Sequence, residues 1–90
     1  MIRHILTGTF VITAAQVKAA RAMLGIDQKT LAEMAGVSLP TIQRMEASDG
    51  NVRGNVDTLT KVIEALNRAG VELLNVGGRG VFLKEQSGDG

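Results

Sequence analysis

Side chains that carry out covalent catalysis are scarce in this sequence of 90 residues. It has no cysteine, which excludes a thiol nucleophile, a disulfide scaffold and the usual structural zinc sites. Its single histidine, His4, has no acidic residue near it in the chain, so we expect a surface or packing role. We recognise no serine–histidine–aspartate set, carboxylate pair or metal-ligand cluster, and the sequence predicts neither an enzyme nor a cofactor.

A glycine-rich segment, Gly77-Gly78-Arg79-Gly80, is the second feature that suggests ligand chemistry. Glycine-rich loops cradle phosphate groups when they join a strand to a helix and end in Gly-Lys-Ser or Gly-Lys-Thr. This segment has neither property, and the β-branched or leucine-rich runs 71–76 and 81–84 flank it. We therefore predict a turn within a β-hairpin.

The composition is that of one small globular domain and does not itself identify a partner. Hydrophobic residues make up 44% of the chain, charged residues 21% and aromatic residues 2%, and the formal net charge is +1. A surface for nucleic acid would therefore require local clustering of the basic residues. No apolar run reaches the roughly 18–20 residues that cross a bilayer, and no signal peptide is recognisable. We expect a cytoplasmic protein without membrane contact.

Four helices are predicted between residues 13 and 70. The first begins with a capping box, in which Thr13 and Gln16 satisfy each other's free backbone N–H groups. It ends at Gly25, because glycine readily adopts the left-handed conformation that terminates a helix. The second helix spans residues 28–35.

The third helix is predicted over 38–47, with Pro40 in its first turn, where a missing N–H costs nothing. A polar loop over 48–55 follows. The fourth helix is expected to follow Asp57 and to end at Gly70, because its apolar residues recur at helical spacing.

The chain outside these helices favours extended structure. Residues 71–85 are predicted to form the hairpin, and residues 86–90 a frayed tail. Residues 1–12 are expected to be extended, and Ile5 to Ile12 to pair with the hairpin of the same or a partner chain. The fold class is therefore mainly α, with a small C-terminal β-hairpin.

Residues 28–46 have the pattern of two short helices separated by a glycine-containing turn. Ala32 is small where the second of these helices must cross closely. Gly36 supplies the left-handed turn conformation that other residues adopt only at a cost. Leu31, Val37 and Ile42 are expected to fill the space between the helices.

On these residues the sequence resembles the Cro and phage-repressor type of helix-turn-helix regulators, often called the xenobiotic-response-element family. The resemblance covers about residues 17–70, and the segments 51–54, 69–72 and 77–81 look like a small bacterial single-domain subgroup with a C-terminal hairpin. It implies a lambda-repressor-like domain of four to five helices that binds double-stranded DNA.

The resemblance also implies roles for individual residues. Phosphate contacts fall on residues at helix starts and in the loop, namely Gln28, Lys29, Ser38, Thr41 and Arg53. Base contacts fall on the exposed face of the third helix, namely Leu39, Pro40, Gln43 and Arg44. Arginine pairs well with guanine and glutamine with adenine, while apolar side chains contact the thymine methyl group.

Arg21 and Glu46 match a pair that forms a structural salt bridge in the family, so neither is expected to contact DNA. Leu39 and Pro40 depart from the family, because phage repressors often have polar residues at these positions. The family's fifth helix, a common dimer contact, has no counterpart in the sequence, which leaves the dimer interface open.

The resulting prediction is a homodimeric repressor that binds a palindromic operator through the helix beginning near Ser38. One alternative is an antitoxin that binds its own promoter and neutralises a toxin partner. The other is an interaction module that uses the same scaffold to bind another protein and not DNA.

Overall fold

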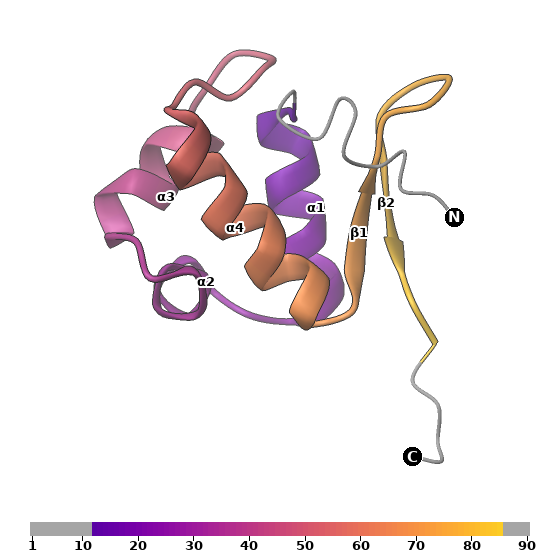
Figure 1. Ribbon diagram of the computed structural model, residues 1–90, viewed down its shortest axis with the longest axis horizontal. Helices are drawn as coiled ribbons and strands as arrows, with labels where there is room; N and C mark the ends of the chain where they lie inside the picture. The colour runs from indigo at the N-terminus through magenta and orange to yellow at the C-terminus, as the bar shows by residue number, and fades with distance from the viewer. Residues whose placement is uncertain (1–11, 86–90) are drawn as a thin grey trace.

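The computed structural model describes residues 12–85, which form four helices followed by a two-stranded antiparallel sheet (Figure 1). The elements are α1 (Ala14–Leu24), α2 (Gln28–Ala35), α3 (Leu39–Glu46), α4 (Val56–Arg68), β1 (Val71–Leu74) and β2 (Gly80–Leu83). The predicted mainly helical fold with a C-terminal hairpin is confirmed. The predictions for residues 1–11 and 86–90 lie outside the described residues.

Both ends of α1 and the end of α2 follow the capping residues recognised in the sequence. The Thr13 hydroxyl accepts the Gln16 backbone N–H at 3.1 Å, and Gln16 Oε1 accepts the Thr13 N–H at 2.9 Å, which completes the capping box of α1. Gly25 and Gly36 end α1 and α2 in the left-handed conformation, with φ of 68° and 72°.

The start of α4 differs from the prediction. The helix begins at Val56, and Asn55 is its N-cap, with Asn55 Oδ1 accepting the Thr58 N–H at 2.7 Å. Placing the start after Asp57 was wrong, because asparagine is as good a cap as aspartate and comes two residues earlier. Asp57 lies in the first turn and forms an exposed ion pair with Lys61 at 3.4 Å.

The segment between α3 and α4 is fixed to the start of α1. The Ala14 N–H donates to Gly50 O at 3.0 Å, and the Val52 N–H donates to Ile12 O at 2.8 Å. Both Val52 and Ile12 are buried in the core. The loop is therefore part of the packed domain, and Ile12, the one described residue of the predicted N-terminal strand, bonds to this loop.

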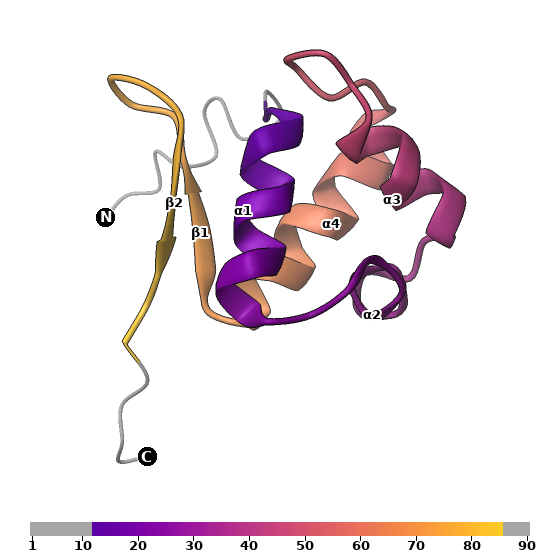
Figure 2. The same ribbon diagram turned by 180° about the vertical axis from the view of Figure 1, so that it is seen from behind.

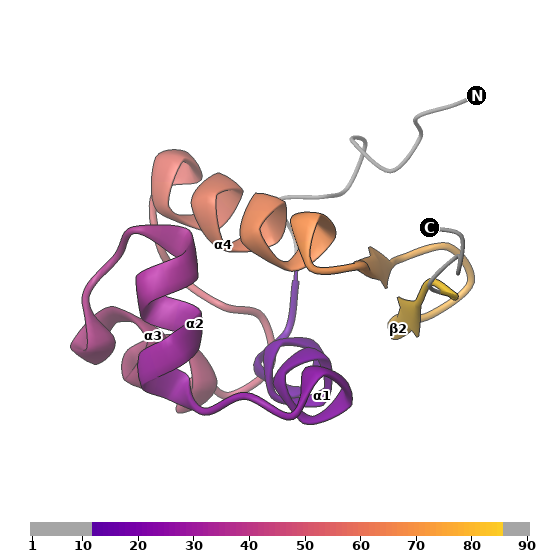
Figure 3. The same ribbon diagram turned by 90° about the horizontal axis from the view of Figure 1, so that it is seen from below.

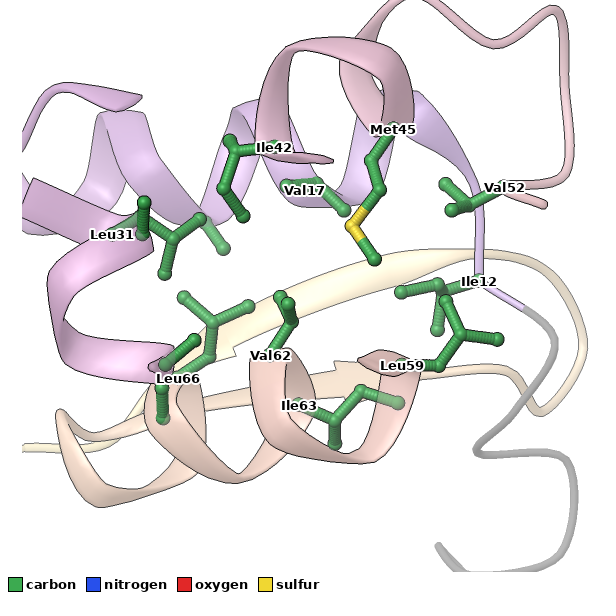
Figure 4. Close-up of a cluster of buried hydrophobic side chains, with 14 of the residues drawn as sticks. Ile12, Val17, Leu31, Ile42, Met45, Val52, Leu59, Val62, Ile63 and Leu66 are labelled. Carbon is green, nitrogen blue, oxygen red and sulfur yellow. The ribbon is translucent and has the colours of Figure 1, made fainter. Parts of the chain in front are cut away.

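The core lies between the helices, with side chains from all four helices and the loop converging on it (Figure 4). Its largest fully buried side chains are Ile12, Val17, Leu31, Ile42, Met45, Val62, Leu66 and Val71. Along the longest axis of the molecule, α2 and α3 occupy one end and the hairpin the other (Figures 1 and 3). The hairpin covers the open side of the layer made by α1 and α4, with β1 against α4 and β2 against α1.

A buried glutamine joins the hairpin to α1. The Gln16 side chain amide donates to Leu74 O and Gly80 O, both at 3.0 Å, and to Asn75 Oδ1 at 3.1 Å. Only 3% of Gln16 is exposed, so these bonds are shielded from water. The same side chain therefore caps α1 through its oxygen and holds the two ends of the hairpin turn through its nitrogen.

Candidate nucleic-acid interface

The α2–turn–α3 unit is the candidate site, and its core positions α3 against α2. Leu31 and Ala32 of α2 are buried, and the Val37 N–H returns to Ala32 O at 3.0 Å across the turn. Ile42 and Met45 bury the inner face of α3. The opposite face of α3 is consequently left in solvent.

The predicted base-contacting residues lie on α3. Pro40, Gln43 and Arg44 are exposed, and Leu39 is half-buried. Residues three or four apart share one side of a helix, so Pro40, Gln43 and Arg44 present a single outer surface. Ala47, which directly follows α3, is also exposed and was not singled out in the sequence.

The predicted phosphate contacts Ser38 and Thr41 lie together at the start of α3. The Ser38 hydroxyl accepts the Thr41 N–H at 3.2 Å, and the two hydroxyl oxygens are 2.8 Å apart in a hydrogen bond. One of the two hydroxyl protons makes that bond, which leaves the other proton for an outside acceptor such as a phosphate oxygen. Pro40 removes one backbone donor from this helix end, so the hydroxyl pair supplies much of its donor capacity.

Gln28, at the start of α2, lies against the last residue of α3. Its side chain amide donates to Glu46 Oε1 at 3.0 Å. Lys29 beside it is exposed. Asp27 caps this helix, and the bond from the Thr30 backbone N–H lowers the pKa of the Asp27 carboxyl group. A phosphate at the start of α2 would therefore contact the Gln28 amide and the Lys29 ammonium, with the Asp27 carboxylate next to them.

Arg21 and Glu46 form a two-pronged ion pair that joins α1 to the end of α3. Arg21 Nε lies 2.6 Å from Glu46 Oε2 and Nη2 lies 2.8 Å from Oε1, while Nη1 donates to Ile26 O at 3.1 Å. Burial acts to raise the Glu46 pKa, but hydrogen bonds from Arg21 and Gln28 outweigh it, and the pKa falls below its ordinary value. The Arg21 pKa is raised, chiefly by its bond to Glu46.

Arg53 is exposed in the loop between α3 and α4, so the structure places it on a different element from the other predicted phosphate contacts. Lys18 is a further exposed cation that was not singled out from the sequence, and its charge contributes to lowering the Glu46 pKa. The sequence does indicate this position, because Lys18 lies three residues before Arg21 and residues three apart on a helix lie on the same side.

The fold and this surface together define a helix-turn-helix domain, in which α3 exposes a polar face and α2 supports it from behind. A protein-family model, Helix-turn-helix (HTH_3), matches residues 17–73, from α1 into β1. The chain belongs to this family of DNA-binding transcriptional regulators, as the resemblance in the sequence implied. A search of curated proteins gave no match. Among the described residues, no helix is long and apolar enough to span a membrane.

Proposed function

We propose that the protein is a homodimeric repressor that reads a palindromic operator by placing α3 in the major groove. The observation that carries this proposal is the outer surface of α3, where Gln43 and Arg44 are exposed beside each other on a helix held rigidly from behind. An amide and a guanidinium are the groups that make paired hydrogen bonds to adenine and guanine. Pro40 and the half-buried Leu39 supply apolar contacts for thymine methyl groups.

The proposed phosphate contacts flank α3 at both ends, which supports this docking. Ser38 and Thr41 lie at its start, and Gln28 lies against its last residue, Glu46. An eight-residue helix is about 12 Å long, comparable to the width of about 12 Å of the major groove. Groups at the two ends of α3 can therefore reach the phosphates on the two sides of the groove and fix its register.

A dimer follows from the limited reach of one short helix, which contacts only a few base pairs. Two copies related by a two-fold axis read two half-sites about 34–36 Å apart, which doubles the contact with one face of the duplex. A protein that occupies such a site next to its promoter represses transcription by excluding the polymerase.

The test is binding to a DNA fragment from upstream of the protein's own gene, titrated at several salt concentrations against a scrambled fragment. We expect Arg44→Ala to lose about 1–3 kcal/mol of specific affinity and to keep its binding to scrambled DNA. Lys61→Ala is the control, because Lys61 is exposed on α4 and paired with Asp57. Equal affinity for both fragments would contradict operator reading.

A further inference from the structure

Helix α1 has apolar residues on its outer side as well as on its inner side. Val17 and Ala20 are fully buried in the core. On the outer side Ala15 and Ala22 are exposed, and 43% of Met23 is exposed. Lys18 is the one charged residue among the four exposed residues of α1, and the other three expose apolar surface. No other described element covers this outer side of α1.

Strand β2 has an unpaired edge next to this helix. The Lys84 N–H donates to Gly70 O at 2.8 Å, which shows which of the facing residue pairs in the two strands are hydrogen-bonded. Because hydrogen-bonded and non-bonded pairs alternate, the N–H and C=O groups of Val81 and Leu83 point away from β1. Within residues 12–85 these groups have no hydrogen-bond partner. The edge carries no charge or proline within β2, the usual protections against strand pairing.

The two features lie next to each other. Strand β2 packs against α1, and in the view from below its outer edge and the outer side of α1 face the same open side of the molecule (Figures 2 and 3). Leu83, on the inner face of the hairpin, is 40% exposed at the border between strand and helix. The surface therefore has hydrogen-bonding groups along one margin and small apolar side chains along the other.

We propose that this surface binds a second copy of the chain, with β2 pairing antiparallel to β2 of the second copy around a two-fold axis at Phe82. This inference rests on the proposed function, because it supplies the interface that the homodimer requires. In this register Val81 faces Leu83 of the second copy, so the outward N–H and C=O groups of both residues are satisfied in both chains. Phe82, which is 51% exposed, meets its own counterpart on the outer face as an aromatic pair.

The charges next to the strand agree with the same register. Arg79 lies three positions before Phe82 and Glu85 three positions after it. Continued past both ends of β2, this register sets Arg79, whose Nη1 also donates to Asn75 Oδ1 at 3.3 Å, opposite Glu85 of the second copy. The reverse pair forms at the other end. A segment whose hydrogen bonds, apolar residues and charges all complement themselves on rotation favours a second copy over an unrelated partner.

Joining the two β2 strands brings the two α1 helices together beneath a four-stranded sheet. Ala15, Ala19 and Ala22 on the outer side of α1 are small enough to allow close approach. Helix α3 stays uncovered, because it is tied to a different side of α1 through the Arg21–Glu46 ion pair. The DNA-reading surface and the dimer interface therefore do not compete.

The first experiment measures the dimer dissociation constant of the full chain by analytical ultracentrifugation. Ala19→Glu places a charge between the α1 helices, and Leu83→Pro removes one outward N–H while sparing the ladder to β1. We expect each to raise the constant at least about tenfold. Val56→Glu, at an exposed apolar residue of α4, is the control and should leave it unchanged. A dimer insensitive to Ala19→Glu and Leu83→Pro, or a monomeric wild type, would overturn the inference.

The second experiment tests the register by charge exchange. Arg79→Glu and Glu85→Arg each place like charges across the two-fold axis, and we expect each to weaken the dimer about three- to tenfold. The double variant restores opposite charges and should recover most of the affinity. Two single losses that simply add in the double variant would overturn the register.

Amide exchange identifies the strand that covers β2. We expect the Val81 and Leu83 amides to be protected only at concentrations where the dimer forms. Protection that is independent of concentration would show that the edge is filled within one chain, and would overturn the inference. Arg44→Ala, assayed alongside, should dimerise normally whether or not the operator is bound, which separates failure of this interface from failure of DNA reading.

Discussion

The Gln28 amide donates a hydrogen bond to Glu46 Oε1 at 3.0 Å, and this bond joins the start of α2 to the end of α3. The Glu46 carboxylate also receives two bonds from Arg21, so one buried acceptor fixes three helices relative to each other. Gln28, which we propose to contact a DNA phosphate, is therefore held in place by Glu46, which we do not expect to contact DNA. The geometry of the reading surface depends on this carboxylate.

Glu46→Gln should destabilise the protein at neutral pH by about 2–3 kcal/mol, because Arg21 loses its charged partner. The figure lies below that for a fully buried pair, since the Arg21 side chain is 22% exposed and can regain water. Urea denaturation followed by circular dichroism measures the change. Glu64→Gln, at an exposed position of α4, is the matched control and should be neutral.

The same pair predicts how stability depends on pH. The folded-state pKa of Glu46 lies below its ordinary value, so its contribution is complete above the unfolded pKa of about 4.3 and is lost as the pH falls through the folded pKa. The stability difference between wild type and Glu46→Gln should therefore shrink as the pH is lowered from 5 towards about 3. A difference that stays constant over this range would show that the charge of Glu46 is not responsible.

Two neighbouring residues of α2 should respond differently to salt. Lys29→Ala should weaken DNA binding for all sequences and reduce the slope of log K against log salt by about 1, because one released counterion is lost. Gln28→Ala should weaken binding with an unchanged slope, because the amide carries no charge. The comparison uses one operator fragment and one scrambled fragment. Identical slopes in both variants would remove Lys29 from the proposed phosphate contacts.

Local signals account for most of what the sequence predicted correctly. Thr13, Ser38 and Gly36 act on backbone groups within a few residues, so their roles are readable without the fold. The second role of Gln16 was not readable, because its acceptors Leu74 and Gly80 are 58 and 64 residues away. The burial of Val52 was missed for the same reason.

The candidate site could likewise be predicted only in part from the sequence. The spacing of residues 28–46 predicts which side of α3 is exposed, because the buried positions Ile42 and Met45 define the opposite side. The bond from Gln28 to Glu46 depends on how α2 crosses α3, which spacing alone does not give. The antitoxin and protein-module alternatives stay predictions, since each concerns a partner and not the fold.

Gln16→Leu should separate the hairpin from the helical domain. The substitution keeps the side chain length but leaves Leu74 O and Gly80 O without the donor that now lies 3.0 Å from each. Each carbonyl keeps the ladder bond of the Leu74–Gly80 pair but loses a second bond worth about 0.5–1.5 kcal/mol, and α1 also loses half of its capping box. Thr13→Ala is the control, because it removes the cap and leaves the amide bonds to the hairpin. We expect faster amide exchange in β1 and β2 for Gln16→Leu alone. Equal exchange in the two variants would mean that packing of Val71 and not the Gln16 amide holds the hairpin in place.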